Sequence, residues 1–285
     1  MNAHPVRPGV VYQATASVAP RLGRLAVRAL FDEAVLDMKP GLVSPSDSGA
    51  HGDMTLATFY RSITALRPYF PTMAALGAAN APWRSLRSHG QAAETVMLRA
   101  TGGINTHRGA IFHLGLLCAA AGALAACNRT LSSGAVCAFV RLNFAPHVLA
   151  TRTPSSHGAA VEMRYGAGGA RNEAAGGYRS VRRWSLPAFR SALAQTRDRE
   201  RASVQALFAL VANVADTNLL WRGGGDGLAF AKGRAQQFLD GGGVLAHDWR
   251  GHAKAVHSDF VARRLSPGGC ADLLAATLFL HDISS

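Results

Sequence analysis

The chain has 285 residues, of which 48% are hydrophobic and only 16% are charged, and Lys and Arg together exceed Asp and Glu by 13. Such a chain can bury a substantial core, which argues against wholesale disorder, and its positive charge favours anionic partners. Nucleic acid is the less favoured partner, because the basic residues are scattered and the aromatic residues, 7% of the chain, are not interleaved with arginines as a stacking platform requires.

Apolar residues recur at helical spacing along most of the chain, and clear strand alternation is hard to find. The first predicted helix, residues 21–38, has Leu22, Leu25 and Leu30 on one face and ends before the KPG at 39–41, where proline and glycine stop a helix. The other predicted helices are residues 54–67, 82–99, 108–127, 134–149, 201–221, 227–240, 247–264 and 269–281. The sequence therefore predicts an all-α fold: an N-terminal extension at 1–20, then a single multi-helix globular domain at 21–285.

Glycine-rich or polar loops connect the predicted helices, and each combines glycine with Asp, Glu, His, Arg or Asn. No repeat at a fixed period relates them, so they are not copies of one module. The region 150–200 is the most irregular and is interpreted as a flap or linker. The five loops are KPGLVSPSDSGAHGDM (39–54), TGGINTHRG (101–109), YGAGGARNEAAGGY (165–178), DTNLLWRGGGDG (216–227) and SPGGCADLL (266–274).

The loop at 101–109 fits an anion-binding element. Its glycines, Gly102 and Gly103, let backbone N–H groups approach a phosphate, and the helix that follows adds favourable dipole charge. The P-loop spacing GxxxxGK[ST] is absent, and a plain helix start with a flexible lead-in remains the alternative. Four polar side chains follow the glycines as further donors: Asn105, Thr106, His107 and Arg108.

Carboxylates are concentrated at these loops, which hold or adjoin eight of the 17 acidic residues. Carboxylates near phosphate loops suit Mg²⁺, which takes oxygen ligands and bridges to substrate phosphates. Helix N-capping is the plain alternative for Asp53 and Asp272, and a solvated helix position is the alternative for Asp32 and Glu94. The eight are Asp32, Glu33, Asp47, Asp53, Glu94, Glu173, Asp216 and Asp272.

Basic and histidine side chains accompany the carboxylates. Arg222, with three glycines after it, equally fits a helix C-terminus, and Asn218 lies four residues earlier on the same face. A zinc site would want more ligands at short spacing than His51 and His107 supply, and no GxSxG elbow is present. The cysteines show no CxxC spacing, the N-terminus shows no secretory signal, and the most apolar run, 114–127, is short for a membrane span. We therefore expect a reduced, cytoplasmic protein without membrane association.

Five segments in order carry a family resemblance. LFDEAVLDMKPGLVSPSDSGAHGDM, TGGINTHRGAIFHLGLLCAAAG, YGAGGARNEAAGGYRSV, ADTNLLWRGG and LSPGGCADLLAATLFL together resemble the triphosphoribosyl-dephospho-CoA synthase family over residues 25–281. Relatives often have Lys where this chain has Arg108, Lys in place of Gly52, and Ser in place of Cys270. Arginine keeps the positive charge, whereas Gly52 removes one, so these departures concern substrate contacts.

The resemblance implies an all-helical fold and an activity: transfer of the triphosphoribosyl part of ATP to the 2′-hydroxyl of 3′-dephospho-CoA, with release of adenine. The product is the prosthetic-group precursor that a separate transferase attaches to an acyl carrier protein. The basic, Ala- and Arg-rich chain favours the malonate decarboxylase branch over citrate lyase. The other interpretations are a non-catalytic CoA- or nucleotide-binding helical protein and a basic RNA-binding helical protein. A homodimer is left open.

Residue roles follow from this reaction as hypotheses, with ATP and dephospho-CoA as substrates and Mg²⁺ as the expected cofactor. Asp53, Glu94 and Asp216 are candidates for the general base or Mg²⁺ ligation, and Asp32 and Glu33 are further metal candidates. His107 either protonates the departing adenine or donates to phosphate. The candidate phosphate- and nucleotide-binding residues are Lys39, His51, Gly102, Gly103, Asn105, Thr106, Arg108, Arg171, Asn218 and Arg222.

Overall fold

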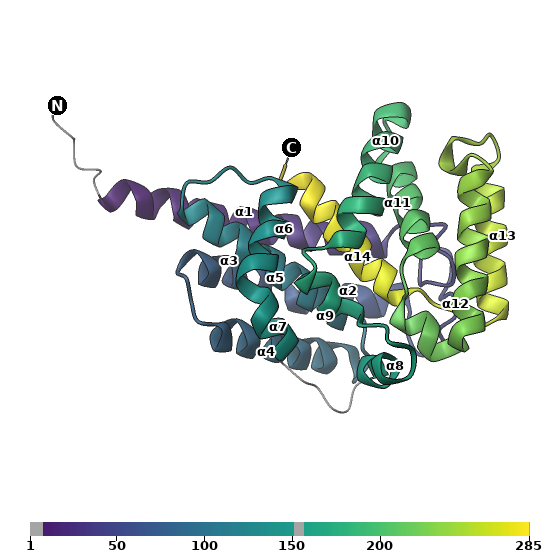
Figure 1. Ribbon diagram of the computed structural model, residues 1–285, viewed down its shortest axis with the longest axis horizontal. Coiled ribbons are helices and arrows are strands. Elements are labelled where there is room, and N and C mark those ends of the chain that lie inside the picture. Colours follow the sequence, from purple (N-terminus) through teal and green to yellow (C-terminus); the bar gives the residue numbers. More distant parts are fainter. Residues whose placement is uncertain (1–7, 151–156, 285) are drawn as a thin grey trace.

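The computed structural model describes residues 8–150 and 157–284, and within these ranges the chain forms helices and no strand. The predicted all-α fold is confirmed. The helices lie around one continuous hydrophobic core (Figure 1). Their bounds are α1 Pro8–Ala34, α2 Leu56–Leu66, α3 Tyr69–Ala78, α4 Trp83–Thr101, α5 Arg108–Ala126, α6 Ser133–Phe139, η1 Val140–Phe144, α7 Ala145–Ala150, α8 His157–Tyr165, α9 Gly169–Ala175, η2 Val181–Ser185, α10 Leu186–Thr196, α11 Arg199–Asn213, α12 Thr217–Asp240, η3 Gly243–Leu245, α13 Trp249–Ala262 and α14 Gly268–Asp282.

Helix α5 is the centre of the core and packs against α1, α3, α4, α6 and α14. The α3 and α5 backbones touch, because a Cβ atom at Gly77 would overlap the carbonyl of Ala119 and one at Gly122 would overlap the carbonyl of Ala74. By length and composition α5 could cross a membrane, but 72% of its apolar window is buried inside the protein. Its apolar character is therefore that of a core helix.

The helices differ from the sequence prediction at several positions, and α3 was not predicted at all. The predicted helix 201–221 is two helices, since α11 ends at Asn213 and the Asp216 side chain caps the start of α12. Helix α12 then continues through the glycines that suggested a stop, with a break at Gly224 (φ 63°, ψ −160°). The region 150–200 is largely helical in its described part, as α8, α9, η2 and α10.

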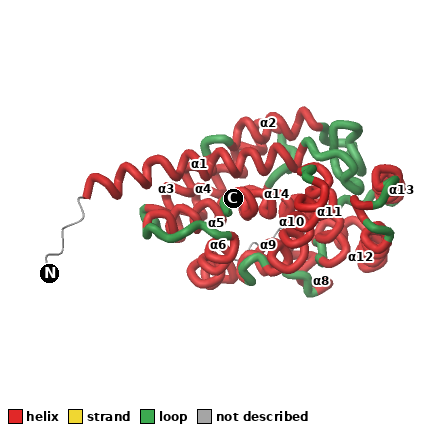
Figure 2. Tube along the Cα trace, turned by 90° about the horizontal axis from the view of Figure 1, so that it is seen from above, coloured by secondary structure: helices red, strands yellow, loops and turns green. Residues whose placement is uncertain are grey.

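The first helix begins earlier than predicted, because α1 starts at Pro8 and not at residue 21, within the stretch called the N-terminal extension (1–20), and runs on into the core. Residues 1–7 of that extension lie outside the described residues. At the other end of α1 the chain enters the loop 35–55, and Figure 2 shows this loop at the same end of the protein as α12 and α13. The helices thus bring together loops that are distant in the sequence.

Candidate active site

The loop 39–54 is fixed against the C-terminal end of α13. His257 of α13 contacts the Asp47 carboxylate through Nε2 at 3.1 Å. Gly41 adopts a positive φ of 64°, and a Cβ atom there would overlap the Leu265 carbonyl, so the two segments touch through backbone. A glycine is required at this position for both reasons. The contact brings the first and the last of the predicted site loops side by side.

Arg222 of α12 joins three separate segments. One guanidinium nitrogen donates to the carbonyls of Ala50 (3.1 Å) and Arg264 (3.2 Å), and the other donates to Nδ1 of His51 (3.2 Å). Nε2 of His51 is then the protonated nitrogen and lies 2.8 Å from Ser266 Oγ. Burial and, second, the Arg222 charge lower the pKa of His51. His51 is therefore a neutral linker between α12 and the segment that precedes α14.

Asp216 performs the same function between α12 and α14. Its Oδ1 accepts the backbone N–H groups of Asn218 (2.7 Å) and Leu219 (3.2 Å), which makes it the N-cap of α12. Its Oδ2 accepts the N–H of Cys270 at 2.7 Å. The side chain is 2% exposed, and burial raises its pKa although these three hydrogen bonds oppose the rise. Both carboxylate oxygens of Asp216 thus accept hydrogen bonds from backbone N–H groups of the protein.

Glu33 and Lys39 form a buried ion pair below these loops. The Lys39 ammonium lies 2.9 Å from Glu33 Oε1 and also donates to the backbone carbonyls of Glu33 (2.7 Å) and Ala34 (3.3 Å). These three acceptors use all three donors of the ammonium group. Only 1% of the Lys39 side chain is exposed. In this structure Lys39 neutralises Glu33 and holds the end of α1.

Asp272 of α14 faces the first turn of α5. A Cβ atom at Gly109 would overlap the Asp272 carboxylate, and the N–H of Ala110 donates to that carboxylate. Burial raises the pKa of Asp272 well above its ordinary value, and the neighbouring carboxylates of Glu33 and Asp216 raise it further. As a whole residue Asp272 keeps some exposed surface, unlike Glu33 and Asp216. Among these three carboxylates, Asp272 is the one that is neither paired with Lys39 nor bound at both oxygens by backbone N–H groups.

His107 occupies the N-cap position of the same helix. Its Nδ1 lies 2.7 Å from Ser62 Oγ, while its Nε2 and the hydroxyl of Thr106 are buried without a hydrogen-bond partner. Burial and the nearby charge of Lys39 lower the pKa of His107 to about 3, so the ring is neutral at physiological pH. Unpaired buried polar groups are costly, which makes these two atoms candidates for contact with a ligand.

The glycines of the 101–109 loop end α4 rather than begin α5. Gly102 and Gly103 have positive φ values of 70° and 90°, and both N–H groups donate to the Leu98 carbonyl. Arg108, the first residue of α5, pairs with Glu94 at 3.1 Å and keeps about half of its side chain exposed. Asn105 accepts the N–H of Arg108 through its side-chain oxygen. The donors available to a ligand are therefore the Arg108 guanidinium and the start of α5.

Comparison with known proteins decides the family. Residues 19–285 match the family model of the ATP:dephospho-CoA triphosphoribosyl transferase. The chain belongs to this family. A probable 2-(5″-triphosphoribosyl)-3′-dephosphocoenzyme-A synthase of Acinetobacter calcoaceticus is 42% identical over 92% of this chain and 90% of its own length. The synthases of Escherichia fergusonii (40%, covering 92% and 90%) and Klebsiella pneumoniae (42%, covering 89% and 87%) are similarly close. No solved structure matches the chain.

As a member of this transferase family, the chain is an enzyme whose family reaction uses ATP and dephospho-CoA. The structure brings together His51, Asn218 and Arg222, three of the ten residues that the sequence analysis proposed for binding these substrates. Segments that hold His51, Asp53, Asn218 and Arg222 meet at the starts of α12 and α14. Asp53 has an exposed carboxylate 3.8 Å from Nδ1 of His51. The site residues proposed from the sequence did not include Ser62 or Asp272. For Asp272, the only indication was that a charged residue stands in the otherwise apolar ADLL segment.

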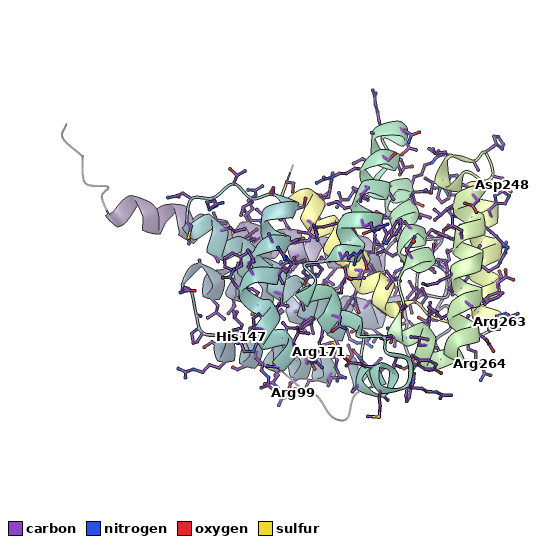
Figure 3. All side chains as sticks on the ribbon, viewed as in Figure 1. Arg99, His147, Arg171, Asp248, Arg263 and Arg264 are labelled. Carbon is purple, nitrogen blue, oxygen red and sulfur yellow. The ribbon has the colours of Figure 1, made fainter. Side chains whose placement is uncertain are left out.

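Two proposed site residues of this transferase lie in other surroundings. Asp32 pairs with Arg199 at 3.0 Å, and Arg199 also binds Asp282 of α14 at 2.8 Å. Arg171 donates to the carbonyls of Val148 (3.3 Å) and Leu149 (3.0 Å) at the end of α7. Figure 3 shows Arg171, a residue of α9, apart from Arg264, which follows α13. Both side chains are engaged in contacts that hold helices together.

One buried histidine of the transferase allows a direct pH test. Burial lowers the pKa of His113 to about 3, whereas the unfolded value is about 6.5, so below pH 6.5 only the unfolded state takes up its proton. This residue therefore lowers the free energy of unfolding by about 2 kcal/mol between pH 7 and pH 5.

We expect His113→Leu to remove that part of the pH dependence. Urea denaturation at both pH values measures it, and His252→Leu, which changes an exposed histidine, is the control. Equal pH dependence in wild type and His113→Leu would contradict the neutral buried imidazole.

Proposed function

We propose that this chain transfers the triphosphoribosyl group of ATP to the 2′-hydroxyl of 3′-dephospho-CoA and releases adenine. Membership of the family supports the reaction. The structural observation that carries the proposal is the buried carboxyl of Asp272 beside the first turn of α5, which directly follows two unpartnered buried atoms, Thr106 Oγ1 and His107 Nε2. This arrangement offers a base, an electropositive helix start and free polar atoms in one place.

The reaction exchanges one bond at the ribose anomeric carbon for another. The bond from C1′ to N9 of adenine breaks with its electron pair going to adenine, and a bond from C1′ to the acceptor 2′-oxygen forms. The hydroxyl proton is taken up by the base, and adenine gains a proton as it leaves. A transition state with oxocarbenium character is expected, as in other glycosyl transfers.

We assign the general base to Asp272. The alternatives within the buried group are already engaged, since Glu33 is paired with Lys39 and both oxygens of Asp216 accept backbone N–H groups. Glu94 is paired with Arg108. A carboxyl whose pKa is raised binds the hydroxyl proton more strongly than an ordinary aspartate does, which suits a general base.

The triphosphate is proposed to bind at the start of α5. Arg108 supplies a half-exposed guanidinium, Thr106 a hydroxyl, and the helix terminus a partial positive charge. His107 is neutral because its pKa is lowered to about 3, so it serves as a hydrogen-bonding group and not as an imidazolium acid. If Nδ1 accepts from the Ser62 hydroxyl, Nε2–H is the atom that donates to a phosphate oxygen.

Magnesium is proposed to reach this site together with ATP. Within residues 8–150 and 157–284, no group of three His, Cys, Asp or Glu side chains is close enough to hold a metal ion alone. Mg²⁺ bound to phosphates keeps several waters and needs only one or two protein carboxylates. The exposed carboxylate of Asp53 fits that requirement, whereas those of Asp32, Glu33 and Asp216 are engaged. The ion would neutralise part of the triphosphate charge.

The pathway is proposed to be that of malonate decarboxylase, with a separate transferase attaching the product to an acyl carrier protein in the cytoplasm. The basic, Ala- and Arg-rich composition supports this choice over citrate lyase. Transfer of the purified product to each acyl carrier protein, with the matching transferase, tests it. Modification of the citrate lyase carrier only would overturn the choice.

Release of adenine is the direct test of the activity. Purified protein incubated with ATP, Mg²⁺ and dephospho-CoA should form adenine and the triphosphoribosyl product in equal amounts, measured by liquid chromatography and mass spectrometry. Omission of dephospho-CoA is the control and should abolish product formation. Binding of both nucleotides without adenine release under any metal condition would favour the alternative, a non-catalytic nucleotide-binding protein.

A further inference from the structure

Ser62 of α2 makes a short contact with the imidazole ring of His107. Its Oγ lies 2.7 Å from Nδ1 of the ring, and both residues are almost completely buried, at 0% and 2% exposure. A hydroxyl can donate or accept a hydrogen bond, whereas each nitrogen of a neutral imidazole does only one of the two. This contact therefore determines which nitrogen of His107 carries the hydrogen.

The count of buried donors and acceptors favours a hydrogen on Nε2. The ring is neutral, because burial and the charge of Lys39 lower the pKa of His107 to about 3. If Nδ1–H donated to Ser62, the Ser62 hydroxyl would have no acceptor among residues 8–150 and 157–284, and Nε2 would also be unpaired. If Ser62 donates to Nδ1, only Nε2–H is left unpaired. The second arrangement has the lower cost, since each unpaired buried group is unfavourable.

The surrounding side chains hold the ring in place. The Phe59 ring stands edge-on to the imidazole, with the two centroids 5.0 Å apart and the planes at 82°. The backbone N–H of His107 lies 3.2 Å from the sulfur of Met97. Turning the ring over to exchange its nitrogens would break the hydrogen bond with Ser62. Nε2–H is therefore held in one direction without a partner in the described residues.

This donor needs an acceptor, and its surroundings favour a negatively charged one. The hydroxyl of Thr106, one residue earlier, is also buried without a partner and can donate as well. The start of α5 adds a partial positive charge, and the Lys39 charge is close enough to affect the ring. An oxygen of a phosphate group is an anionic acceptor that suits two neighbouring donors at a helix start.

The chain just before these two residues is loosely packed. Gly102, Gly103 and Asn105 are exposed, and a Cβ atom at either glycine would meet no other atom within 4 Å. A local movement of this segment therefore meets little resistance, and such a movement gives a phosphate oxygen access to the two buried atoms.

We propose that Ser62 is a positioning residue, which holds His107 in the Nε2–H tautomer so that this hydrogen is donated to an oxygen of the triphosphate. This rests on the proposed function, in which the triphosphate binds at the start of α5. Ser62 itself touches no substrate and acts through the ring. His107 is then a phosphate donor and not the acid that protonates adenine.

The tautomer can be read directly by nitrogen NMR of wild-type protein labelled with ¹⁵N-histidine. The signals that disappear in His107→Gln identify the ring. We expect Nδ1 of His107 to have the chemical shift of a non-protonated nitrogen and Nε2 that of a protonated one. A protonated Nδ1 would overturn the proposal, whether or not the protein releases adenine.

Binding measurements test the consequence for the substrate. ATP and inorganic tripolyphosphate, each with Mg²⁺, are titrated calorimetrically into wild type, Ser62→Ala and Ser62→Thr. We expect Ser62→Ala to weaken both ligands by about tenfold, the order of one hydrogen bond to a charged group, and to raise KM for ATP with kcat nearly unchanged. Ser62→Thr keeps the hydroxyl and should retain most of the affinity.

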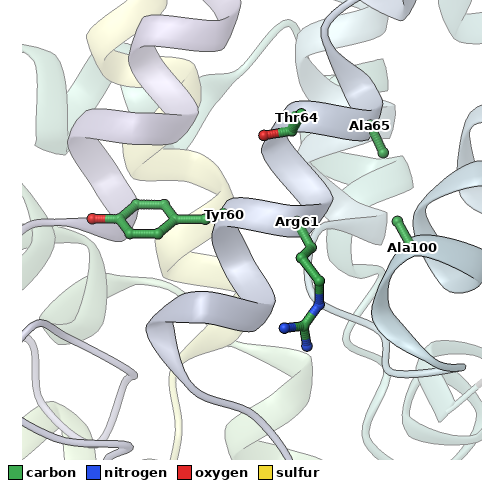
Figure 4. Close-up of a pocket in the computed structure, with 5 residues that line it drawn as sticks. All are labelled: Tyr60, Arg61, Thr64, Ala65 and Ala100. Atoms are coloured by element: carbon green, nitrogen blue, oxygen red, sulfur yellow. The ribbon is translucent and has the colours of Figure 1, made fainter.

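Two other hydroxyl variants are the matched controls. Ser185→Ala removes an equally buried hydroxyl, which lies 2.6 Å from that of Thr277, and shows what a loss of stability alone does to binding. Thr64→Val changes an exposed hydroxyl of the same helix α2, which lines the hollow between α2 and α4 shown in Figure 4. Both should bind the two ligands as wild type does, and circular dichroism confirms that each variant is folded.

Unchanged binding of both ligands to Ser62→Ala would overturn the proposal. So would a loss for ATP alone, which would place His107 at the base, and so would a wild type that binds neither ligand. Adenine release by the wild type together with unchanged binding in Ser62→Ala would leave the proposed function standing without this role of Ser62. Binding that depends on Ser62 without adenine release would do the reverse.

Discussion

Asp272→Asn should lower kcat for adenine release by about 10²–10⁴-fold while ATP still binds, because the variant removes a general base and little else. The asparagine keeps the size of the side chain and can still accept the Ala110 N–H that now meets the carboxylate. Steady-state kinetics and ATP calorimetry measure the two parts of this expectation. A structural role alone would reduce the folded fraction and would not reduce kcat of the folded enzyme.

The pH profile separates these roles further. Burial raises the pKa of Asp272, so the proton that must leave before the carboxylate can act as a base leaves at a higher pH than from an ordinary aspartate, whose pKa is about 4. The wild-type rate should therefore fall with decreasing pH already well above pH 4, and the residual rate of Asp272→Asn should lack this acidic limb. Asp259→Asn, which removes an ion pair between α13 and Arg234 of α12, is the carboxylate control and should leave kcat unchanged. Full activity of Asp272→Asn would exclude it as the base.

Lys39→Met should lower the free energy of unfolding by about 3–5 kcal/mol, the largest stability effect that we expect in this chain. The substitution leaves the Glu33 carboxylate buried without its partner, and it removes one donor from each of the Glu33 and Ala34 backbone carbonyls. Urea denaturation at pH 7 with circular dichroism measures the change.

The double variant Glu33→Gln/Lys39→Met tells an ion pair from a substrate contact. It removes both charges, so most of the lost stability should return. If Lys39 instead served as a phosphate ligand, the single variant would be nearly as stable as wild type and would bind ATP more weakly. A loss of stability below about 1 kcal/mol for Lys39→Met would contradict the buried pair.

The sequence predicted the helices and the site loops better than it predicted the partners of individual side chains. Periodicity located α5 closely, because an apolar helix carries its signal in every turn. It merged α11 with α12, because the break between them depends on the Asp216 side chain and on no proline or glycine. It also treated the glycines at 223–225 as a stop, whereas packing against Leu265 and Tyr165 accommodates them inside α12.

The roles of charged residues depended on contacts between segments that are far apart in the chain. Lys39 follows Glu33 by six residues, and nothing in that spacing indicates that both are buried against each other. Asp272 lies in an apolar helix and was considered as one of eight loop carboxylates or as an N-cap, and neither interpretation indicated that it faces Gly109 in α5. No sequence pattern marked Ser62 as a site residue, because its role depends on the 2.7 Å contact between its Oγ and His107 Nδ1, which only the tertiary structure shows. Such roles follow from the tertiary packing that the loop motifs alone do not specify.

The shared carboxylate of Asp216 has a consequence for how this enzyme can open. It accepts the first amides of α12 and the amide of Cys270 in α14, which are separated by about fifty residues of chain. Withdrawing either helix start leaves a buried acceptor short of a donor, at a cost of about 1–3 kcal/mol. The two helix starts therefore form one cooperative unit, so that substrate access must come from movement of the surrounding loops while α12 and α14 stay together.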